Sequence, residues 1–169
     1  LGQIQYPHAL PRLKEVLLRP DVKPDSTTAR IVSAAMVNCA GGDRRVLQKP
    51  VSELFYELGE KYYNRAESLQ PDPRFENVPA LAWFWTEGTG LTNVQVPRPI
   101  LCDIYAMRMS RLALSHEPKF SLAVPLWMCS AIRRQFDLPD GAKDPLWSAD
   151  QPSSEFYALA SSPRYLQAS

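Results

Sequence analysis

Proline placement is the feature that most restricts how this chain can fold. The sequence holds 16 prolines but only 7 glycines, and many of the prolines fall at or near the ends of segments whose apolar residues follow helical spacing. Proline breaks a helix interior because it lacks the backbone N–H and its ring clashes with the preceding turn, whereas the first turn tolerates it. The sequence therefore predicts an all-α fold of short helices separated by proline-marked corners.

Apolar periodicity places the helices between these corners. We expect helices over residues 7–19, 26–40, 51–69, 100–116 and 120–136. Asp25 or Ser26 is suited to cap the second helix, and Gly41 with Gly42 is suited to end it. Residues 72–98 are interpreted as a partly irregular insertion, in which "EGTG" predicts a turn and "TNVQVP" is loosely typical of a strand. Residues 137–169 are rich in loop residues and contain one short expected helix, "SSEFYALASS".

The first 42 positions carry a pattern of their own. Pro11 lies in the first expected helix, Asp21 in the corner, and the second expected helix contains Ala29, Arg30, Ala34 and Ala35. This arrangement resembles a HEAT repeat over residues 1–42. The resemblance implies that Asp21 or Asp25 bonds Arg30 along the stack.

The same resemblance makes "LGQI" the tail of an earlier helix. We therefore expect the chain to be a fragment of a larger protein, with its first helix pair poorly covered. The side chains that should then be exposed are Leu1, Ile4, Leu10 or Leu13.

A second pattern covers residues 43–136. It consists of Gly59, Tyr63, Ala66 and Pro71, which recur as Ala106, Ser110, Ala113 and Pro118 at a constant offset of 47 (106 minus 59). This is similar to the second-helix signature of tetratricopeptide repeats, in which small residues admit the partner helix and proline turns the chain into the next repeat. The resemblance implies a short α-solenoid of antiparallel helix pairs, interrupted by the insertion at 72–98.

Charge and hydropathy exclude some classes of partner. The chain has 19 basic and 18 acidic residues, a formal net charge of +1, so no basic stripe indicates a nucleic acid. No apolar run approaches the roughly 20 residues that a membrane span needs. The sequence gives no indication of the compartment.

Signals for catalysis or for a metal are weak. We find no glycine-rich phosphate loop and no Gly-x-Ser-x-Gly motif. His8 and His116 lack a second ligand at metal-binding helical spacing. Glu53, Glu57 and Glu60 share a helix face that is better explained as solvated, with Lys61 nearby. We expect no catalytic residue, no cofactor and no metal.

The three cysteines are distant from one another in the sequence. Cys39, Cys102 and Cys129 form no Cys-x-x-Cys pair, which disfavours a disulfide framework or a zinc cluster. We interpret them as buried thiols on helix faces. "IRRQF" with Lys143 is a small basic patch, which we interpret as the polar end of a helix.

Aromatic residues in the insertion are the most conspicuous local feature. Trp83, Phe84 and Trp85 are consecutive. They can hold a ligand or a partner peptide, or they can anchor the insertion on the helices. We favour the anchor, because three adjacent aromatics cannot all face one way and at least one should be buried. "VPRPI" is either a polyproline II segment or, in our preferred interpretation, a linker. The candidate partner or ligand contacts are Trp83, Trp85 and Arg98.

The functional hypothesis is a non-catalytic helical-repeat scaffold that binds a protein or peptide. The alternative is an enzyme or small-ligand-binding domain with a pocket between the Trp83–Trp85 insertion and the helices. A third possibility is a purely structural segment of a longer solenoid. Polar, titratable side chains that converge on a pocket beside Trp83 and Trp85 would favour the alternative.

Overall fold

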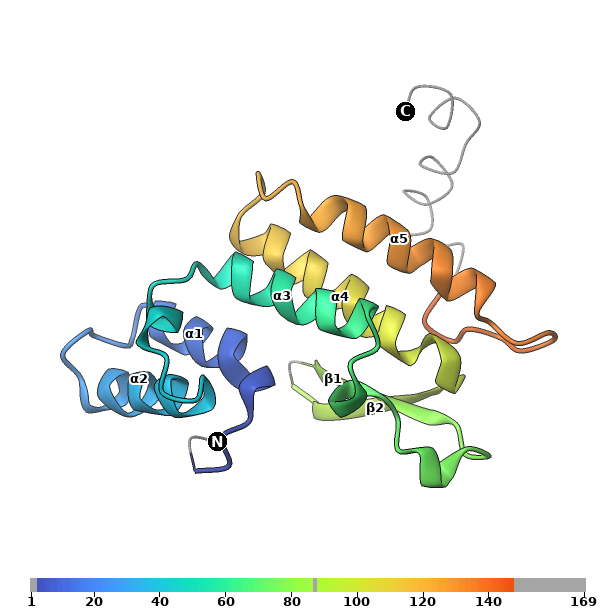
Figure 1. The fold of residues 1–169 in the computed structure, drawn as a ribbon, viewed down its shortest axis with the longest axis horizontal. Helices are drawn as coiled ribbons and strands as arrows, with labels where there is room; N and C mark the ends of the chain where they lie inside the picture. The colour runs from blue at the N-terminus through green and yellow to red at the C-terminus, as the bar shows by residue number, and fades with distance from the viewer. Residues whose placement is uncertain (1–2, 87, 148–169) are drawn as a thin grey trace. The chain divides into compact units, whose positions relative to one another are not determined.

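The computed structural model describes residues 3–86 and 88–147, and these are mostly helical (Figure 1). The α-helices are α1 (Leu10–Leu18), α2 (Thr27–Cys39), α3 (Val51–Tyr63), α4 (Leu101–His116) and α5 (Ala123–Phe136). Two strands, β1 (Ala80–Thr86) and β2 (Gly90–Val96), form an antiparallel hairpin. The helical character expected from the sequence is confirmed, and the partly irregular insertion that we expected at 72–98 contains a hairpin, of which only the second strand was anticipated. The expected helix in "SSEFYALASS" lies outside the described residues.

The chain divides into two compact units, which are described separately below. Unit 1 combines the residues up to Leu58 with Met109–Ala123. Unit 2 combines Gly59–Arg108 with the described residues from Val124 onward, which end at Trp147. Thus α3 and α4 each contribute residues to both units. The repeat pattern of the sequence predicts a division of the chain at residues 42 and 136. The two compact units follow a different criterion, so that division stays a prediction.

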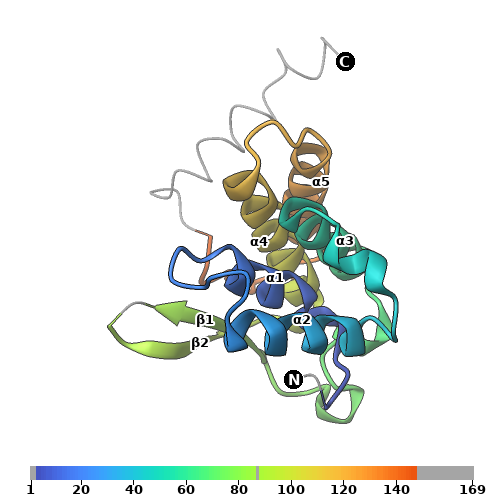
Figure 2. The ribbon, with the colours of Figure 1, turned by 90° about the vertical axis from the view of Figure 1, so that its left-hand side faces the viewer.

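Unit 1 is built around α1 and α2, which lie side by side in both ribbon views (Figures 1 and 2). Ser26 caps α2 as expected, since its Oγ accepts the Ala29 N–H at 3.1 Å. At the other end Gly41 adopts a φ of 65°, and the Gly42 N–H reaches the Val37 carbonyl at 2.9 Å. This left-handed closure is the one that glycine permits at least cost. The buried core of unit 1 comprises Ala9, Leu13, Met36, Cys39, Val46 and Leu54.

The corner between α1 and α2 corrects one expectation. Asp21 accepts from Arg19 Nε at 2.9 Å and from Nη2 at 2.8 Å, so the expected bond from Asp21 to Arg30 is wrong. The alternative bond from Asp25 to Arg30 stays a prediction. Arg19 is extended at the end of α1, which places its guanidinium beside a carboxylate only two residues away.

The N-terminal side chains meet the exposure expectation only in part. Ile4 is 74% exposed, whereas Leu13 is buried and Leu10 packs against the core of unit 1. Leu1 lies outside the described residues.

Helix α3 ends earlier than the sequence indicates. The expected helix ran to residue 69, but Arg65 adopts a φ of 53° and the Ala66 N–H bonds the Lys61 carbonyl at 2.9 Å. The Arg65 N–H bonds the Tyr62 carbonyl at 2.9 Å, which completes a Schellman closure with arginine at the position that usually holds glycine. The chain then leaves the helix direction, so the α3 prediction is wrong after Tyr63.

This early end also affects the repeated small-residue signature. Ala106 and Ala113 lie inside α4 and are fully buried, as expected. Ala66 lies beyond the end of α3, with φ −51° and ψ 132°, and is only half-buried. The two passages are therefore not structurally equivalent at the second small residue, and Ala66 does not make the expected helix crossing.

In unit 2 the hairpin packs by one face on α4. The core there comprises Ala80, Ala82, Val96, Ile100, Leu101 and Ile104. A second cluster joins Trp127 and Ala131 of α5 to Met107 of α4. The "EGTG" turn expectation is confirmed at its glycines, since Gly88 and Gly90 have φ of 81° and 82°.

Candidate functional site

The hairpin of unit 2 has two chemically distinct faces. Facing pairs across the strands include Leu81 with Gln95, Trp83 with Asn93, and Trp85 with Leu91. Successive side chains of a strand point to opposite faces. These pairs therefore share one face, the outer face, while Ala80, Ala82, Phe84, Val94 and Val96 share the inner face that packs on α4.

The outer face is open and mostly apolar, with Asn93 and Gln95 as its polar side chains. The exposed fractions are 41% for Leu81, 42% for Trp83, 73% for Trp85 and 63% for Leu91. Both tryptophans are exposed, so the interpretation of them as anchors is wrong, whereas Phe84 packs against the core as the one inward aromatic. Alternation puts one of three consecutive aromatics inside and two outside. An exposed cluster of two indoles and two leucines is the kind of surface that protein partners contact.

The outer face is held in place by side chains of α4. Tyr105 Oη accepts the Trp83 N–H at 2.8 Å, and Arg108 Nη1 donates to the Trp83 carbonyl at 2.7 Å. The Arg108 guanidinium also lies 5.1 Å from the centre of the Phe84 ring. Tyr105 in turn stacks on Tyr62 with ring centres 5.0 Å apart. Trp83 is therefore presented from a backbone that is fixed to a helix.

Arg98 is not part of this face. Its Nη1 and Nη2 donate to the carbonyls of Phe75 at 2.9 Å and Asp72 at 2.6 Å. It lies beyond the end of β2, in the short 3-10 helix Arg98–Ile100. The structure brings Trp83 and Trp85 to one face and places Arg98 elsewhere, where it ties the start of the insertion to the end of β2.

Arg98 instead borders a cavity of about 330 Å³ between the insertion and the start of α4. The lining includes Arg65, Gln70, Glu76, Arg98, Cys102 and neighbouring prolines. Two guanidinium groups beside one carboxylate can hold a small anion. Cys102 is not poised as a nucleophile there, because burial raises the pKa of its thiol.

A buried ion-pair network supports this end of unit 2. Asp103 on α4 is fully buried and accepts from Arg133 Nε of α5 at 2.8 Å. Arg65 Nη2 lies 3.5 Å from the other Asp103 oxygen and also contacts Asp137. Burial raises the pKa of Asp103, and the neighbouring arginines oppose that rise. The Arg133 guanidinium lies 3.9 Å from the Tyr63 ring centre, so the network also clamps the end of α3.

The "IRRQF" segment forms the last turns of α5, as expected, but both of its arginines are paired with carboxylates. Arg134 is buried and donates to both oxygens of Asp144, at 2.6 and 2.8 Å, beneath the ring of Trp147. Sequence reasoning missed Asp103 and the carboxylate partners of Arg133 and Arg134, because those partners are 30 and 10 positions away and no local pattern marks them.

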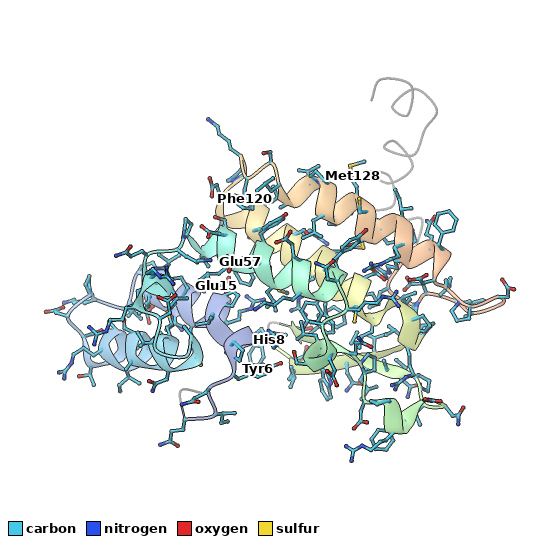
Figure 3. The ribbon with its side chains drawn as sticks, in the orientation of Figure 1. Tyr6, His8, Glu15, Glu57, Phe120 and Met128 are labelled. Atoms are coloured by element: carbon cyan, nitrogen blue, oxygen red, sulfur yellow. The ribbon has the colours of Figure 1, made fainter. Side chains whose placement is uncertain are left out.

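The histidines lie in unit 1 and act in packing. His116 Nε2 lies 2.8 Å from Glu15 Oε1, and its ring stacks on Phe55 with ring centres 5.7 Å apart. His8 meets Tyr6 edge to face at 5.0 Å, and Figure 3 labels both. These contacts connect helices and the chain start of unit 1, in keeping with structural rather than catalytic use.

The expected carboxylate and cysteine positions have mixed surroundings. Glu53 and Glu57 are paired with Lys49 rather than Lys61. Of the thiols, Cys39 and Cys102 are buried as expected, but Cys129 is exposed.

The described residues contain neither a metal-binding cluster nor a membrane-spanning helix. Within 3–86 and 88–147, no group of three or more histidine, cysteine or acidic side chains could hold a metal ion. Over the same residues, no helix combines the length and apolarity needed to cross a membrane.

Comparison with protein-family models, curated proteins and solved structures gives no significant match.

Proposed function

We propose that this chain is a non-catalytic helical scaffold that binds a protein partner through the outer face of its hairpin. The observation that carries the proposal is the grouping of Trp83 and Trp85 with Leu81 and Leu91 on one exposed face. Tryptophan is enriched among the residues that dominate binding energy, because it buries a large area with few rotatable bonds.

The rigid mounting of this face also supports binding. The Trp83 backbone is fixed by Tyr105 and Arg108, so little backbone order has to be gained when a partner docks. A free hairpin would lose part of its contact energy to that ordering. The face is therefore organised before it meets a partner.

The proposal includes the finer expectation of a helical-repeat solenoid. Its support is the adjacent α1–α2 pair of unit 1 and the fully buried small residues of α4, Ala106 and Ala113. Small residues at helix crossings let a neighbouring helix approach closely, as repeat scaffolds require.

Photo-crosslinking tests the proposal. A photoreactive phenylalanine analogue replaces Trp85 in one variant and Ile31, which is 63% exposed on α2, in a second. In extracts of the producing cells, the Trp85 position is expected to give a discrete adduct that the Ile31 position does not give. An excess of wild-type chain should abolish this adduct by competing for the partner, while an excess of Trp83→Ser/Trp85→Ser chain should not. Adducts that both competitors remove equally would refute binding through this face.

A second candidate function is favoured by the cavity beside Arg65 and Arg98. In this alternative the chain binds a small anion, such as a carboxylate or phosphate, with the two guanidinium groups as its donors. Thermal unfolding with 10 mM inorganic phosphate or acetate tests it. A rise in midpoint that Arg98→Gln abolishes would support the alternative, and an equal response of both chains would reject it.

A further inference from the structure

The backbone hydrogen bonds of Trp83 show which backbone groups of β2 point away from the hairpin. In an antiparallel pair, the N–H and C=O of one residue point to the same side. Those of Trp83 point away from β2, to Tyr105 and Arg108. Trp83 and Asn93 are therefore a facing pair without mutual backbone bonds, and the N–H and C=O of Asn93 must point away from β1.

The same orientation recurs two residues to either side, at Leu91 and Gln95. Within residues 3–86 and 88–147, no group bonds the outward N–H and C=O of Leu91, Asn93 or Gln95. All three residues are exposed. This row of backbone donors and acceptors is the β2 edge.

The β2 edge lacks the usual protection against pairing. Natural edge strands are guarded by charged side chains, proline or a bulge. The strand "GLTNVQV" contains no charge and no proline, and its register with β1 is unbroken from Ala80–Val96 to Thr86–Gly90. An unguarded edge of this kind is expected to be covered when the protein is assembled.

The β2 edge is also complementary to itself. When two copies are antiparallel about a twofold axis at Asn93, Asn93 faces Asn93 of the second copy and Leu91 faces Gln95. All these residues have outward N–H and C=O groups, so each facing pair exchanges both of its hydrogen bonds. A twofold axis shifted to Leu91 or Gln95 would leave part of the row unpaired.

We propose that a second copy of this chain pairs with the β2 edge, joining two hairpins into one four-stranded sheet centred on Asn93. A second copy satisfies this edge with groups already present, and twofold pairing is the commonest form of homo-oligomer. The dimer goes beyond the proposed partner binding, since it uses the strand edge and not the outer face. Because the paired stretch is short, we expect a weak, concentration-dependent dimer.

Sedimentation velocity of the wild-type chain, up to about 1 mM, tests the dimer. Asn93→Lys puts two like charges opposite each other at the twofold axis, which is destabilising in a sheet, and it leaves the inner face untouched. The matched control is Asn77→Lys, which adds the same charge in the exposed loop before β1. We expect Asn93→Lys to weaken association at least tenfold and Asn77→Lys to leave it within twofold.

Crosslinking supplies an independent measurement. In a Cys129→Ser background, which removes the exposed thiol, Asn93→Cys and Asn77→Cys are treated with a short bismaleimide. Covalent dimer should form at least tenfold faster through position 93. A wild-type chain that stays monomeric throughout the range would overturn the proposal. So would a dimer that Asn93→Lys leaves intact, or equal crosslinking at the two positions.

Discussion

Trp83 and Asn93 face each other across the hairpin, yet the backbone N–H and C=O of Trp83 are bonded to Tyr105 and Arg108 on the opposite side. This relationship fixes the hairpin to α4 and leaves the β2 edge open. It also explains why Trp83 is exposed while its backbone is held in place.

Tyr105→Phe should loosen the hairpin without unfolding the protein. The Trp83 N–H then loses its acceptor, which we expect to lower the free energy of unfolding by about 1 kcal/mol. Amide exchange at Trp83 should accelerate, while exchange in the α2 helix of unit 1 should be unchanged. Unaltered exchange at Trp83 would show that the Tyr105 bond does not hold the strand.

Arg65 has a strained backbone, and its side chain contacts the buried ion-pair network around Asp103. Its φ of 53° is unfavourable for any residue with a Cβ, and glycine removes that cost. Arg65→Gly and Arg65→Ala both lose the contacts to Asp103 and Asp137. Urea unfolding should nevertheless show Arg65→Gly to be more stable than Arg65→Ala by roughly 1 kcal/mol.

Glu60, inside the last turns of α3, is the control for that comparison. There the order should reverse, with Glu60→Gly less stable than Glu60→Ala by about 1 kcal/mol. The same order at both positions would contradict a left-handed Arg65.

Because Asp103 is buried, the stability lost in an Arg133→Met variant should depend on pH. Arg133→Met leaves a buried carboxylate without its main donor, which should cost about 3–5 kcal/mol at pH 8. The pKa of Asp103 is already raised by burial, and losing Arg133 raises it further. An acid whose folded pKa exceeds its unfolded value destabilises the fold above the folded pKa. That penalty is lost as pH falls toward the unfolded value.

The difference in unfolding free energy between wild type and Arg133→Met should therefore shrink from pH 8 to pH 4.5, as measured by urea titration. Adding Asp103→Asn to the variant should remove the pH dependence. A difference that stays constant with pH would show that Asp103 is not the group responsible.

Local signals account for what the sequence predicts well. The start of α2 at Ser26 and its end at Gly41 follow from capping chemistry within a few residues. The end of α3 carries no such signal, because its left-handed residue is Arg65 rather than glycine. The contacts that hold Arg65 come from Asp103 and Asp137, which lie 38 and 72 positions further along the chain.

The hairpin shows why the candidate site was only partly predictable. β2 alternates apolar and polar residues, and its strand character was partly anticipated. β1 has apolar residues on both faces, so its sequence shows no alternation of hydropathy that would separate the inner from the outer side chains. The sequence therefore selected Trp83 and Trp85 correctly as conspicuous residues and assigned them to the wrong side. Their partners in the register, Asn93 and Leu91, could be named only from the strand pairing.

The central claim is that a partner binds through the outer face. The most direct test is to purify the partner that crosslinking identifies and to titrate it, by calorimetry, into three chains. These are wild type, Trp83→Ser/Trp85→Ser, and Leu18→Ser/Ile31→Ser, whose substituted residues are equally exposed apolar side chains of unit 1. Loss of two interface tryptophans should weaken binding at least about thirtyfold, which is roughly 2 kcal/mol. The unit 1 variant should bind within twofold of wild type. Equal affinity of all three chains would contradict the account.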